Sequence, residues 1–208
     1  RQRQMCIRDR SGLISRLDRY IWEQAAAKLG EWKKAGINMS ISVNISPKDF
    51  YYIDIFNTFA GLIKKYDIEP SNLKIEITET TIMSDVPNLM GELEELRKAG
   101  FTLEMDDFGS GYSSLNTLKD INVDVLKVDM GFIKETKNVK KSRIILASVI
   151  KMAKELNLLI ITEGVETEEQ VDNLTKLGCD VFQGYYFSKA IDVNEFEKRY
   201  LYLSLIHI

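Results

Sequence analysis

The sequence predicts an α/β fold, a TIM-like (β/α)8 barrel. Short β-like runs alternate with longer helical patterns, which indicates a parallel sheet with helices outside it. The predicted strands are polar along one face, and the mouth of a barrel gives such a face somewhere to point. The chain has 208 residues, whereas eight βα units typically take about 250. We therefore expect the barrel to be short by one or two βα units.

Six segments are predicted as strands, because they are short, rich in β-branched residues and bounded by turn residues. In order, they are Asn38–Ile45, Leu73–Glu79, Phe101–Asp107, Asp124–Asp129, Leu158–Glu163 and Asp180–Gln183. Helical spacing of apolar residues predicts helices over Leu13–Ala35, Lys48–Tyr66, Val86–Ala99, Val139–Leu156 and Thr167–Leu177. Three of these helices run into Gly36, Gly100 and Gly178, where a left-handed cap suits glycine.

The alternation within the strands decides between an open sheet and a barrel. Both faces of an open doubly wound sheet pack on helices, so its central strands are apolar on both sides. In this chain one face is apolar, with residues such as Val43, Ile75 and Leu103. The other face holds Ser42, Asn44, Ser46, Lys74, Glu76, Thr78, Thr102, Glu104, Asp106, Lys127, Asp129, Glu163 and Gln183. Such a polar face favours the barrel.

Composition excludes several classes of function. The net charge is −3 and the basic residues are dispersed, so no nucleic-acid track is expected. No apolar run approaches the roughly 18 residues of a membrane span, and we expect a cytoplasmic domain. Cys6 and Cys179 lie far apart, which argues against a disulfide framework or a zinc site, and Cys179 is expected to be a buried thiol. The one histidine, His207, is next to last, which argues against histidine-based catalysis.

The two ends of the chain do not continue these patterns. Residues 1–10 are charged and aperiodic, and residues 201–208 do not extend the acidic helix that ends near Tyr200. Both ends resemble sequence foreign to the gene. We therefore predict a non-native lead over residues 1–10, a barrel domain over residues 11–200 that is incomplete at its N-terminus, and a non-native tail over residues 201–208.

Polar groups at the carboxyl ends of different strands form the candidate site. Asn44, Glu76, Asp106 and Asp107 make an oxygen-only set, and such ligands suit Mg²⁺ or Mn²⁺. Two adjacent aspartates repel each other, so a site that keeps both charged favours a cation. Two metal ions held there would activate water for attack on a phosphodiester. Lys127 would neutralise phosphate charge or hold the water, and Glu163 would be the general base.

Each of these residues also has an ordinary structural explanation. Asp106 and Asp107 could form a strand-end turn, Lys127 and Glu163 an ion pair inside the barrel, and Asn44 a helix cap. The Gly109-Ser110-Gly111 segment lacks the spacing of either nucleotide-binding fingerprint. The convergence of polar groups from five strands on one rim favours a functional site.

At this point the sequence resembles a known family. The matching segments are Val43-Asn44-Ile45-Ser46, Glu76-Ile77-Thr78-Glu79, Asp106 to Leu115, Lys127-Val128-Asp129, Glu163-Gly164-Val165-Glu166 and Gln183-Gly184-Tyr185-Tyr186-Phe187. They resemble, in order, the motif set of the EAL domain family of cyclic-di-GMP-specific phosphodiesterases. The likeness runs from about Gly12 to Tyr200.

The resemblance implies a role for each matched position. Four of them, Asn44, Glu76, Asp106 and Asp107, would hold two divalent metals, Mg²⁺ or Mn²⁺. Lys127 and Glu163 would serve the attacking water, and Gln183 would lie at the rim of the substrate or metal site. Glu79 would brace the loop that contains Gly109 and Gly111 and that links metal occupancy to dimer contacts. The implied activity is hydrolysis of cyclic-di-GMP to linear pGpG in bacterial second-messenger signalling. The implied partners are cyclic-di-GMP, a second copy of the chain, and an upstream regulatory or GGDEF-type domain.

The chain departs from the family pattern at its start. The Glu-Ala-Leu tripeptide of the first barrel strand is absent, and with it one metal-binding glutamate; Thr162 and Ala190 also differ from the family's usual Ala and Pro. The predicted barrel therefore lacks its first strand, and we expect this fragment to be inactive although its parent is an enzyme. Two alternatives remain. The first is a non-catalytic cyclic-di-GMP receptor or scaffold, but such members of the family usually lose the aspartate pair, the lysine or the glutamate. The second is a barrel enzyme such as an aldolase, which would form a Schiff base on Lys127 and would not need Asp106 and Asp107.

Overall fold

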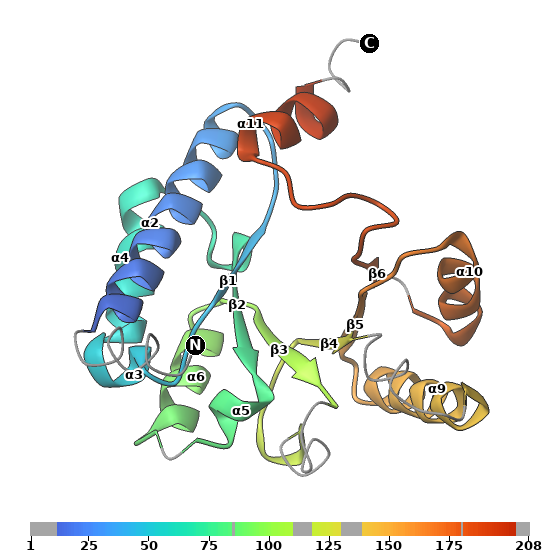
Figure 1. Ribbon diagram of the computed structural model, residues 1–208. Helices are drawn as coiled ribbons and strands as arrows, with labels where there is room; N and C mark the ends of the chain where they lie inside the picture. Colours follow the sequence, from blue (N-terminus) through green and yellow to red (C-terminus); the bar gives the residue numbers. More distant parts are fainter. Residues whose placement is uncertain (1–11, 85, 110–117, 130–138, 180, 203–208) are drawn as a thin grey trace.

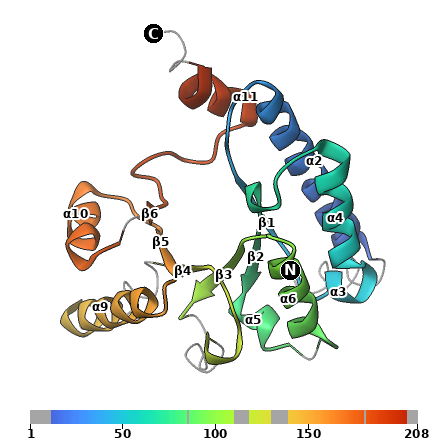
Figure 2. The same cartoon turned by 180° about the vertical axis from the view of Figure 1, so that it is seen from behind.

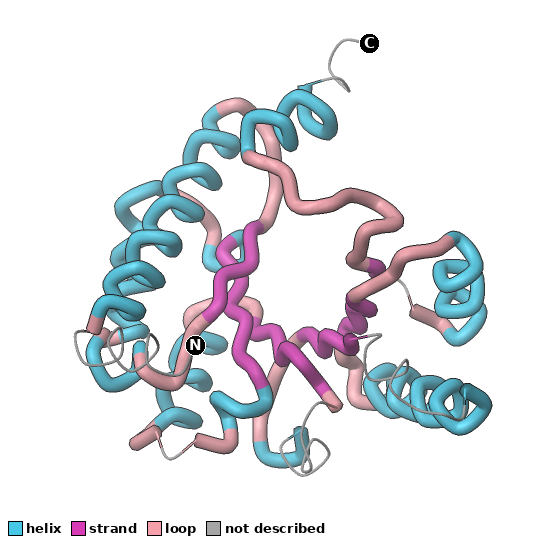
Figure 3. Tube along the Cα trace, viewed as in Figure 1, coloured by secondary structure: helices cyan, strands magenta, loops and turns pink. Residues whose placement is uncertain are grey.

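A single curved sheet forms the centre of the molecule in the computed structural model, and helices cover its outer side (Figures 1 and 3). The structure describes residues 12–84, 86–109, 118–129, 139–179 and 181–202. The sheet contains six strands in chain order, and every neighbouring pair is parallel. This confirms the predicted TIM-like arrangement of alternating strands and helices.

The strands lie where they were predicted, although several are shorter than the sequence suggested. They are β1 (Ile41–Asn44), β2 (Leu73–Thr78), β3 (Leu103–Phe108), β4 (Val125–Asp129), β5 (Leu159–Glu163) and β6 (Val181–Phe182). In the described part of the chain β1 and β6 are the two edges, each paired on one side only.

The longer helices surround the sheet, as the view from behind also shows (Figure 2). They are α2 (Leu13–Lys34), α4 (Ile55–Tyr66), α6 (Leu89–Lys98), α9 (Val139–Glu155) and α10 (Glu168–Leu177). Short helical segments lie between them: α3 (Asp49–Tyr52), η1 (Pro70–Asn72), α5 (Glu79–Ile82), α11 (Val193–Phe196) and the π-helical η2 (Glu197–Tyr202). None of these described helices is both long and apolar enough to cross a membrane.

Three predicted boundaries were wrong, and local hydrogen bonds explain two of them. The single helix expected over residues 48–66 is divided, because Ile53 is extended and the Asp54 carboxylate caps a new helix by accepting from Asn57 N at 3.0 Å. Glu79 begins α5 instead of ending β2, because the Thr78 hydroxyl caps that turn. Helix α6 begins at Leu89, later than predicted.

The outer face of the sheet packs on the helices and forms the core. Leu73, Ile75 and Ile77 of β2 are fully buried there. On the helix side the rings of Trp22 and Phe59 lie 5.0 Å apart between centroids. Full burial of an aliphatic side chain of this size contributes about 1.5–3 kcal/mol. The apolar residues therefore face the helices, which leaves the polar face for the interior of the curved sheet, as predicted.

The edge strands β1 and β6 do not pair with each other, and the C-terminal helices lie on that side of the sheet and contact α2. Trp32 of α2 donates its indole N–H to Glu197 Oε1 at 2.8 Å, and its ring lies 5.9 Å from that of Phe196. Figure 1 shows the segment after β6 running from the sheet back to α2. The first and last described helices are therefore in direct contact.

Candidate active site

Lys127 lies at the centre of a cluster of carboxylates inside the curved sheet. Its ammonium nitrogen is 2.8 Å from Glu76 Oε1, 2.8 Å from Glu163 Oε1 and 3.3 Å from Asp106 Oδ1. The lysine residue is only 3% exposed. Four different strands, β2 to β5, thus each contribute one charged group to the same point.

The sheet register explains why these side chains meet. Carboxyl ends of parallel strands lie at the same edge, and side chains two residues apart share a face. Asn44 is in register with Glu76, Thr78 with Asp106, and Asp129 with Glu163. The predicted site residues on β1 to β5 therefore lie at one end of the sheet.

A β-bulge brings the two adjacent aspartates into the same region. In a regular strand, Asp106 and Asp107 would point to opposite faces. The β3–β4 register shifts between Met105 and Phe108, and Asp107 has the left-handed backbone angle φ of 57°. The pKa of Asp107 is raised, first by burial and then by the charges of Asp106 and Asp129. Both aspartates thus belong to the cluster, although strand alternation alone would separate them.

Burial and mutual repulsion raise the pKa values of the glutamates in the cluster. For both Glu76 and Glu163, burial is the larger cause; the ammonium of Lys127 opposes it, and Asp106 adds to it. Burial lowers the pKa of Lys127, but its close contacts with the carboxylates of Glu163 and Glu76 outweigh this effect and raise it. The lysine therefore stays charged, and the carboxylates around it outnumber it.

Asp129 belongs to this region, although it was not predicted as a site residue. It acts on Asp107 and is in register with Glu163. The signal was present in the sequence, since Lys127-Val128-Asp129 places two charged side chains on the same face of β4.

The backbone around Asn44 is fixed from two sides. Trp22 of α2 donates its indole N–H to the Asn44 carbonyl oxygen at 2.9 Å, and the next residue, Ile45, donates its N–H to the Glu76 carbonyl at 3.0 Å. The Asn44 side chain is exposed at the end of β1. It is thus available to a ligand while its backbone is held in place.

The remaining predicted residues lie at or after the ends of β2, β3 and β6. Gln183 follows β6, is exposed, and exchanges backbone hydrogen bonds with Thr162 and Val165. Glu79 is 1% exposed at the start of α5, directly after β2. Gly109 follows the bulge with φ of 97°, an angle that favours glycine. Gly111 lies outside the described residues.

The donor set fits a hard divalent cation. All the candidate ligands offer oxygen, which Mg²⁺ and Mn²⁺ prefer, and Mg²⁺ usually takes only one or two protein carboxylates and fills its shell with water and phosphate oxygens. In the described part of the chain, no three acidic, histidine or cysteine side chains converge closely enough to enclose an ion by themselves. Lys127 lies among Glu76, Asp106 and Glu163 instead. Water and substrate would therefore have to complete the coordination.

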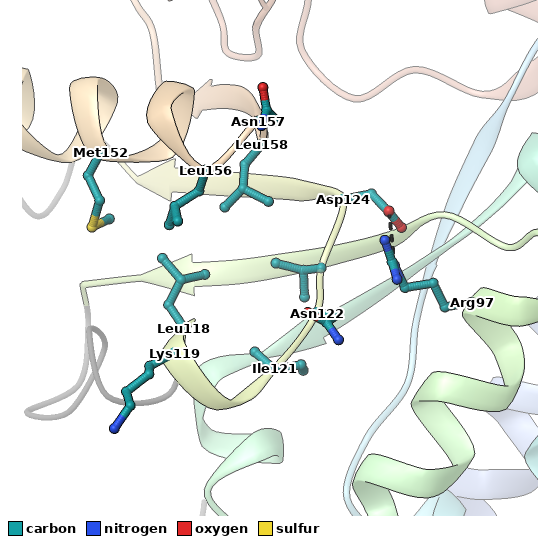
Figure 4. Close-up of a pocket in the computed structure, with 11 residues that line it drawn as sticks. Arg97, Leu118, Lys119, Ile121, Asn122, Asp124, Met152, Leu156, Asn157 and Leu158 are labelled. Atoms are coloured by element: carbon teal, nitrogen blue, oxygen red, sulfur yellow. Dashed lines mark hydrogen bonds and ion pairs between the residues drawn. The ribbon is translucent and has the colours of Figure 1, made fainter.

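A separate hollow of about 620 Å³ lies at the opposite end of the strands (Figure 4). Its lining includes Asp124, which precedes β4, and Leu158, which precedes β5. Asp124 pairs with Arg97 at 3.3 Å and accepts the Leu103 N–H at 2.9 Å. These contacts join β3, β4 and α6, so this end of the sheet serves stability, as the amino-terminal face of such barrels usually does.

Comparison of the whole sequence with known proteins finds related signalling proteins. The chain is 33% identical over 192 residues to the signaling protein YkoW of Bacillus subtilis, matching 92% of this chain and 24% of that protein. It is also 33% identical to the bifunctional diguanylate cyclase/cyclic di-GMP phosphodiesterase MucR of Pseudomonas aeruginosa, over 90% of this chain and 27% of MucR. The chain thus spans about a quarter of the length of these relatives.

Solved structures show the same similarity in three dimensions. A MucR phosphodiesterase in complex with c-di-GMP superposes with a TM-score of 0.83 at 32% identity, over 92% of this chain and 78% of that chain. Klebsiella pneumoniae BlrP1 in a manganese/cy-diGMP complex superposes with a TM-score of 0.74 at 29% identity, over 84% of this chain and 44% of that chain.

The description of the matching sequence family is "EAL domain", and its model matches residues 3–190. This span includes every strand of the sheet and every residue of the carboxylate cluster around Lys127. The chain belongs to the EAL domain family.

Proposed function

We propose that this domain, as part of its parent protein, hydrolyses cyclic-di-GMP to linear pGpG in bacterial signalling, with two divalent metal ions, Mg²⁺ or Mn²⁺. The observation that carries the proposal is the cluster around Lys127, where one ammonium group meets three carboxylates from three other strands. The family membership supports it, and so do the printed names of MucR and of the BlrP1 manganese complex.

Asn44, Glu76, Asp106 and Asp107 are the proposed metal ligands. Two bound ions would polarise the phosphodiester and lower the pKa of an attacking water. The ligands come from three adjacent strands, and the bulge at Asp107 adds a second carboxylate beside the first. Asp129 lies close enough to act on Asp107 and would contribute negative charge to the same ions.

Glu163 and Lys127 are the proposed catalytic pair. Glu163 would take the proton from the attacking water, and its raised pKa suits a group that must bind a proton during the reaction. Lys127 remains charged, orients the Glu163 carboxylate at 2.8 Å, and would stabilise the charge that develops on the phosphate.

Gln183, Glu79, Gly109 and Gly111 have supporting roles in the proposal. Gln183 would contact substrate at the rim, because it follows the strand next to Glu163. Glu79 would position the chain after β3 from the neighbouring strand, and the two glycines would give that loop its backbone freedom. A homodimer and an upstream regulatory or GGDEF-type domain belong to the same proposal; the bifunctional name of MucR is consistent with the latter.

The function is tested by measuring cyclic-di-GMP turnover with Mg²⁺, Mn²⁺ and Ca²⁺. The 208-residue chain contains no Glu-Ala-Leu tripeptide, and we expect it to show no measurable hydrolysis. Adding a family-type first strand with its glutamate before Ser11 should produce turnover with Mg²⁺ or Mn²⁺ and little with Ca²⁺, whose larger and looser shell misplaces the water. Hydrolysis that EDTA leaves undiminished would rule out the metal mechanism.

The role of Glu163 is tested in the extended chain with Glu163→Gln, which keeps the shape of the side chain and removes the base. We expect kcat to fall by about 10² to 10⁴ while cyclic-di-GMP binding, measured by calorimetry, persists. Near-normal kcat would show that another group is the base. Binding without any turnover in the extended parent would favour a receptor instead of an enzyme.

A further inference from the structure

Asp49, at the start of α3, is a buried carboxylate with only one of its two oxygens hydrogen-bonded. The residue is 0% exposed. Its Oδ2 accepts from both the backbone N–H and the hydroxyl of Ser46, each at 2.8 Å. Its Oδ1 has no hydrogen-bond donor among the described residues. A buried acceptor without a donor costs about 1–3 kcal/mol, and more if it is charged.

A second carboxyl group, that of Asp18 on α2, is close enough to Asp49 to interact with it. Two ionised carboxylates contain acceptors only, so a hydrogen bond between them requires a proton on one of them. The pKa of Asp18 is raised to about 6, first by burial and then by the charge of Asp49 and the hydrogen bond to it. A protonated Asp18 supplies the donor that Asp49 otherwise lacks.

These two residues lie beside the chain turn that follows Asn44. Ser46, which binds Asp49, is two residues beyond Asn44. Trp22, which binds the Asn44 carbonyl, is one helical turn beyond Asp18 on α2. Helix α2 therefore contacts this turn at two points, directly through Trp22 and through the Asp18–Asp49 pair.

We propose that Asp18 and Asp49 share one proton, and that this acid pair holds the turn after Asn44 against α2. Asp18 and Asp49 are then positioning residues, since they act on Asn44 through Ser46 and the backbone. The shared proton does not depend on metal binding; only its consequence for catalysis rests on the function proposed above.

The other charged groups near α2 face different partners. In the described residues, the one charge that acts on Asp18 is that of Asp49. Other charged groups of the described part of α2 have partners elsewhere. Glu23 interacts with Lys65 and Tyr66 of α4 and with Arg19, Lys28 with Glu31 and Glu197, and Lys33 with Asp67 and Glu69. Among the described residues no basic side chain acts on Asp18, so the repulsion from Asp49 favours the proton.

The proton is tested by NMR titration of the 208-residue chain with labelled aspartate. We expect one carboxyl of the pair to titrate near pH 6 instead of near 3.8. The Ser46 amide and the Trp22 indole N–H should shift with the same midpoint. The Trp32 indole, which binds Glu197 at the other end of α2, is the internal control and should not follow it. A titration near pH 3.8 would overturn the proposal. So would chemical shifts of the Ser46 amide and the Trp22 indole N–H that do not change near pH 6.

Variants separate the proton from the carboxyl groups themselves. Asp18→Asn carries a permanent donor, so it should keep the Ser46 amide shift and lose the titration near pH 6. Because the folded-state pKa of Asp18 is raised, its contribution to stability is complete below about pH 4 and is lost as the pH rises through about 6. The gain in Tm of Asp18→Asn over the parent should therefore increase from pH 4 to pH 7.

Matched substitutions complete the test. Glu23→Gln changes a partly exposed carboxylate of the same helix, whose pKa is lowered by its hydrogen bond to Lys65, and should show no such increase. Asp18→Leu removes the donor and should destabilise the chain at pH 5, where Asp18→Asn does not. A Tm difference between Asp18→Asn and the parent that is constant with pH would exclude a shared proton. The two proposals can fail separately. If Asp18→Asn behaves as expected but no extended chain hydrolyses cyclic-di-GMP, the shared proton is supported and the proposed phosphodiesterase function is rejected.

Discussion

Two layers of charged side chains lie on the inner face of the sheet, and they differ in balance. In the layer nearer the amino-terminal ends of the strands, Lys74 pairs with Glu104 at 3.1 Å, and the Ser42 hydroxyl binds the other oxygen of Glu104 at 2.9 Å. One lysine meets one carboxylate, and Glu104 is 1% exposed. Glu104 is therefore buried, Lys74 is partly exposed, and their charges balance.

In the layer nearer the carboxyl ends, one lysine meets three carboxylates, and two more aspartates lie nearby. Residues two apart on β2, Lys74 and Glu76, thus belong to layers with different roles. A balanced buried pair needs no ligand, whereas an excess of negative charge favours a cation. The comparison separates a structural ion pair from a candidate site inside one sheet.

The largest expected effect comes from removing the central lysine. Lys127→Met leaves Glu76, Asp106 and Glu163 close together without their ammonium group, and loss of one partner of a buried pair costs about 3–5 kcal/mol. Urea unfolding of the 208-residue chain measures this loss. Lys74→Met, the matched change in the other layer, should cost a similar amount. Mn²⁺ should recover part of the loss in Lys127→Met and none in Lys74→Met, and equal recovery in both would remove the distinction between the layers.

Metal binding to the unsubstituted chain should give the next largest effect. A ligand at 100 times its Kd stabilises the folded state by about 2.7 kcal/mol, so saturating Mn²⁺ should raise the Tm. Asp106→Asn should reduce this increase, because it removes a carboxylate from the proposed ligand set. Glu104→Gln, which changes the balanced layer, should leave it intact. An increase that survives Asp106→Asn would locate the metal elsewhere.

Glu79→Ala should have a smaller effect on stability, of about 1–3 kcal/mol, because it removes a buried polar side chain at the start of α5. We expect circular dichroism to show an intact fold and the Mn²⁺-induced increase in Tm to become smaller. Gross unfolding would assign Glu79 to the core instead of to the support of the site.

The smallest effect is expected from replacing the balanced pair as a whole. Exchange of a buried ion pair for apolar residues of similar volume is often neutral or stabilising, so Lys74→Met with Glu104→Leu should leave the urea midpoint almost unchanged. Cyclic-di-GMP hydrolysis in the extended chain should also persist. A strong loss of turnover would show that the two layers act as one unit.

The sequence predicted the order and type of the strands because each has a regular alternation that neighbouring elements support. It also predicted that Glu76, Asp106, Lys127 and Glu163 would lie together, since residues at equivalent strand ends must meet in a parallel sheet, and these side chains are in contact. Their functional roles stay a prediction. The break at Asp54 and the start of α5 at Glu79 were missed, because single capping hydrogen bonds decided them.

The hydrogen bonds between elements could not be predicted from one sequence. Trp22 and Asn44 are 22 residues apart, and nothing in the local pattern of either residue indicates the other. The bulge at Asp107 was missed for a related reason, since it depends on how β3 fits β4. The predicted non-native ends, residues 1–10 and 201–208, lie almost entirely outside the described residues and stay a prediction.

The left-handed backbone at Asp107 has a consequence for how this protein could be engineered. A residue with a side chain usually costs about 1–2 kcal/mol in that conformation, and glycine avoids most of this cost. Asp107→Gly should therefore make the fold more stable while it removes a carboxylate from the cluster. A search for thermostable variants that did not measure turnover would be expected to select this substitution. One substitution would then raise the stability of the fold and lower its activity.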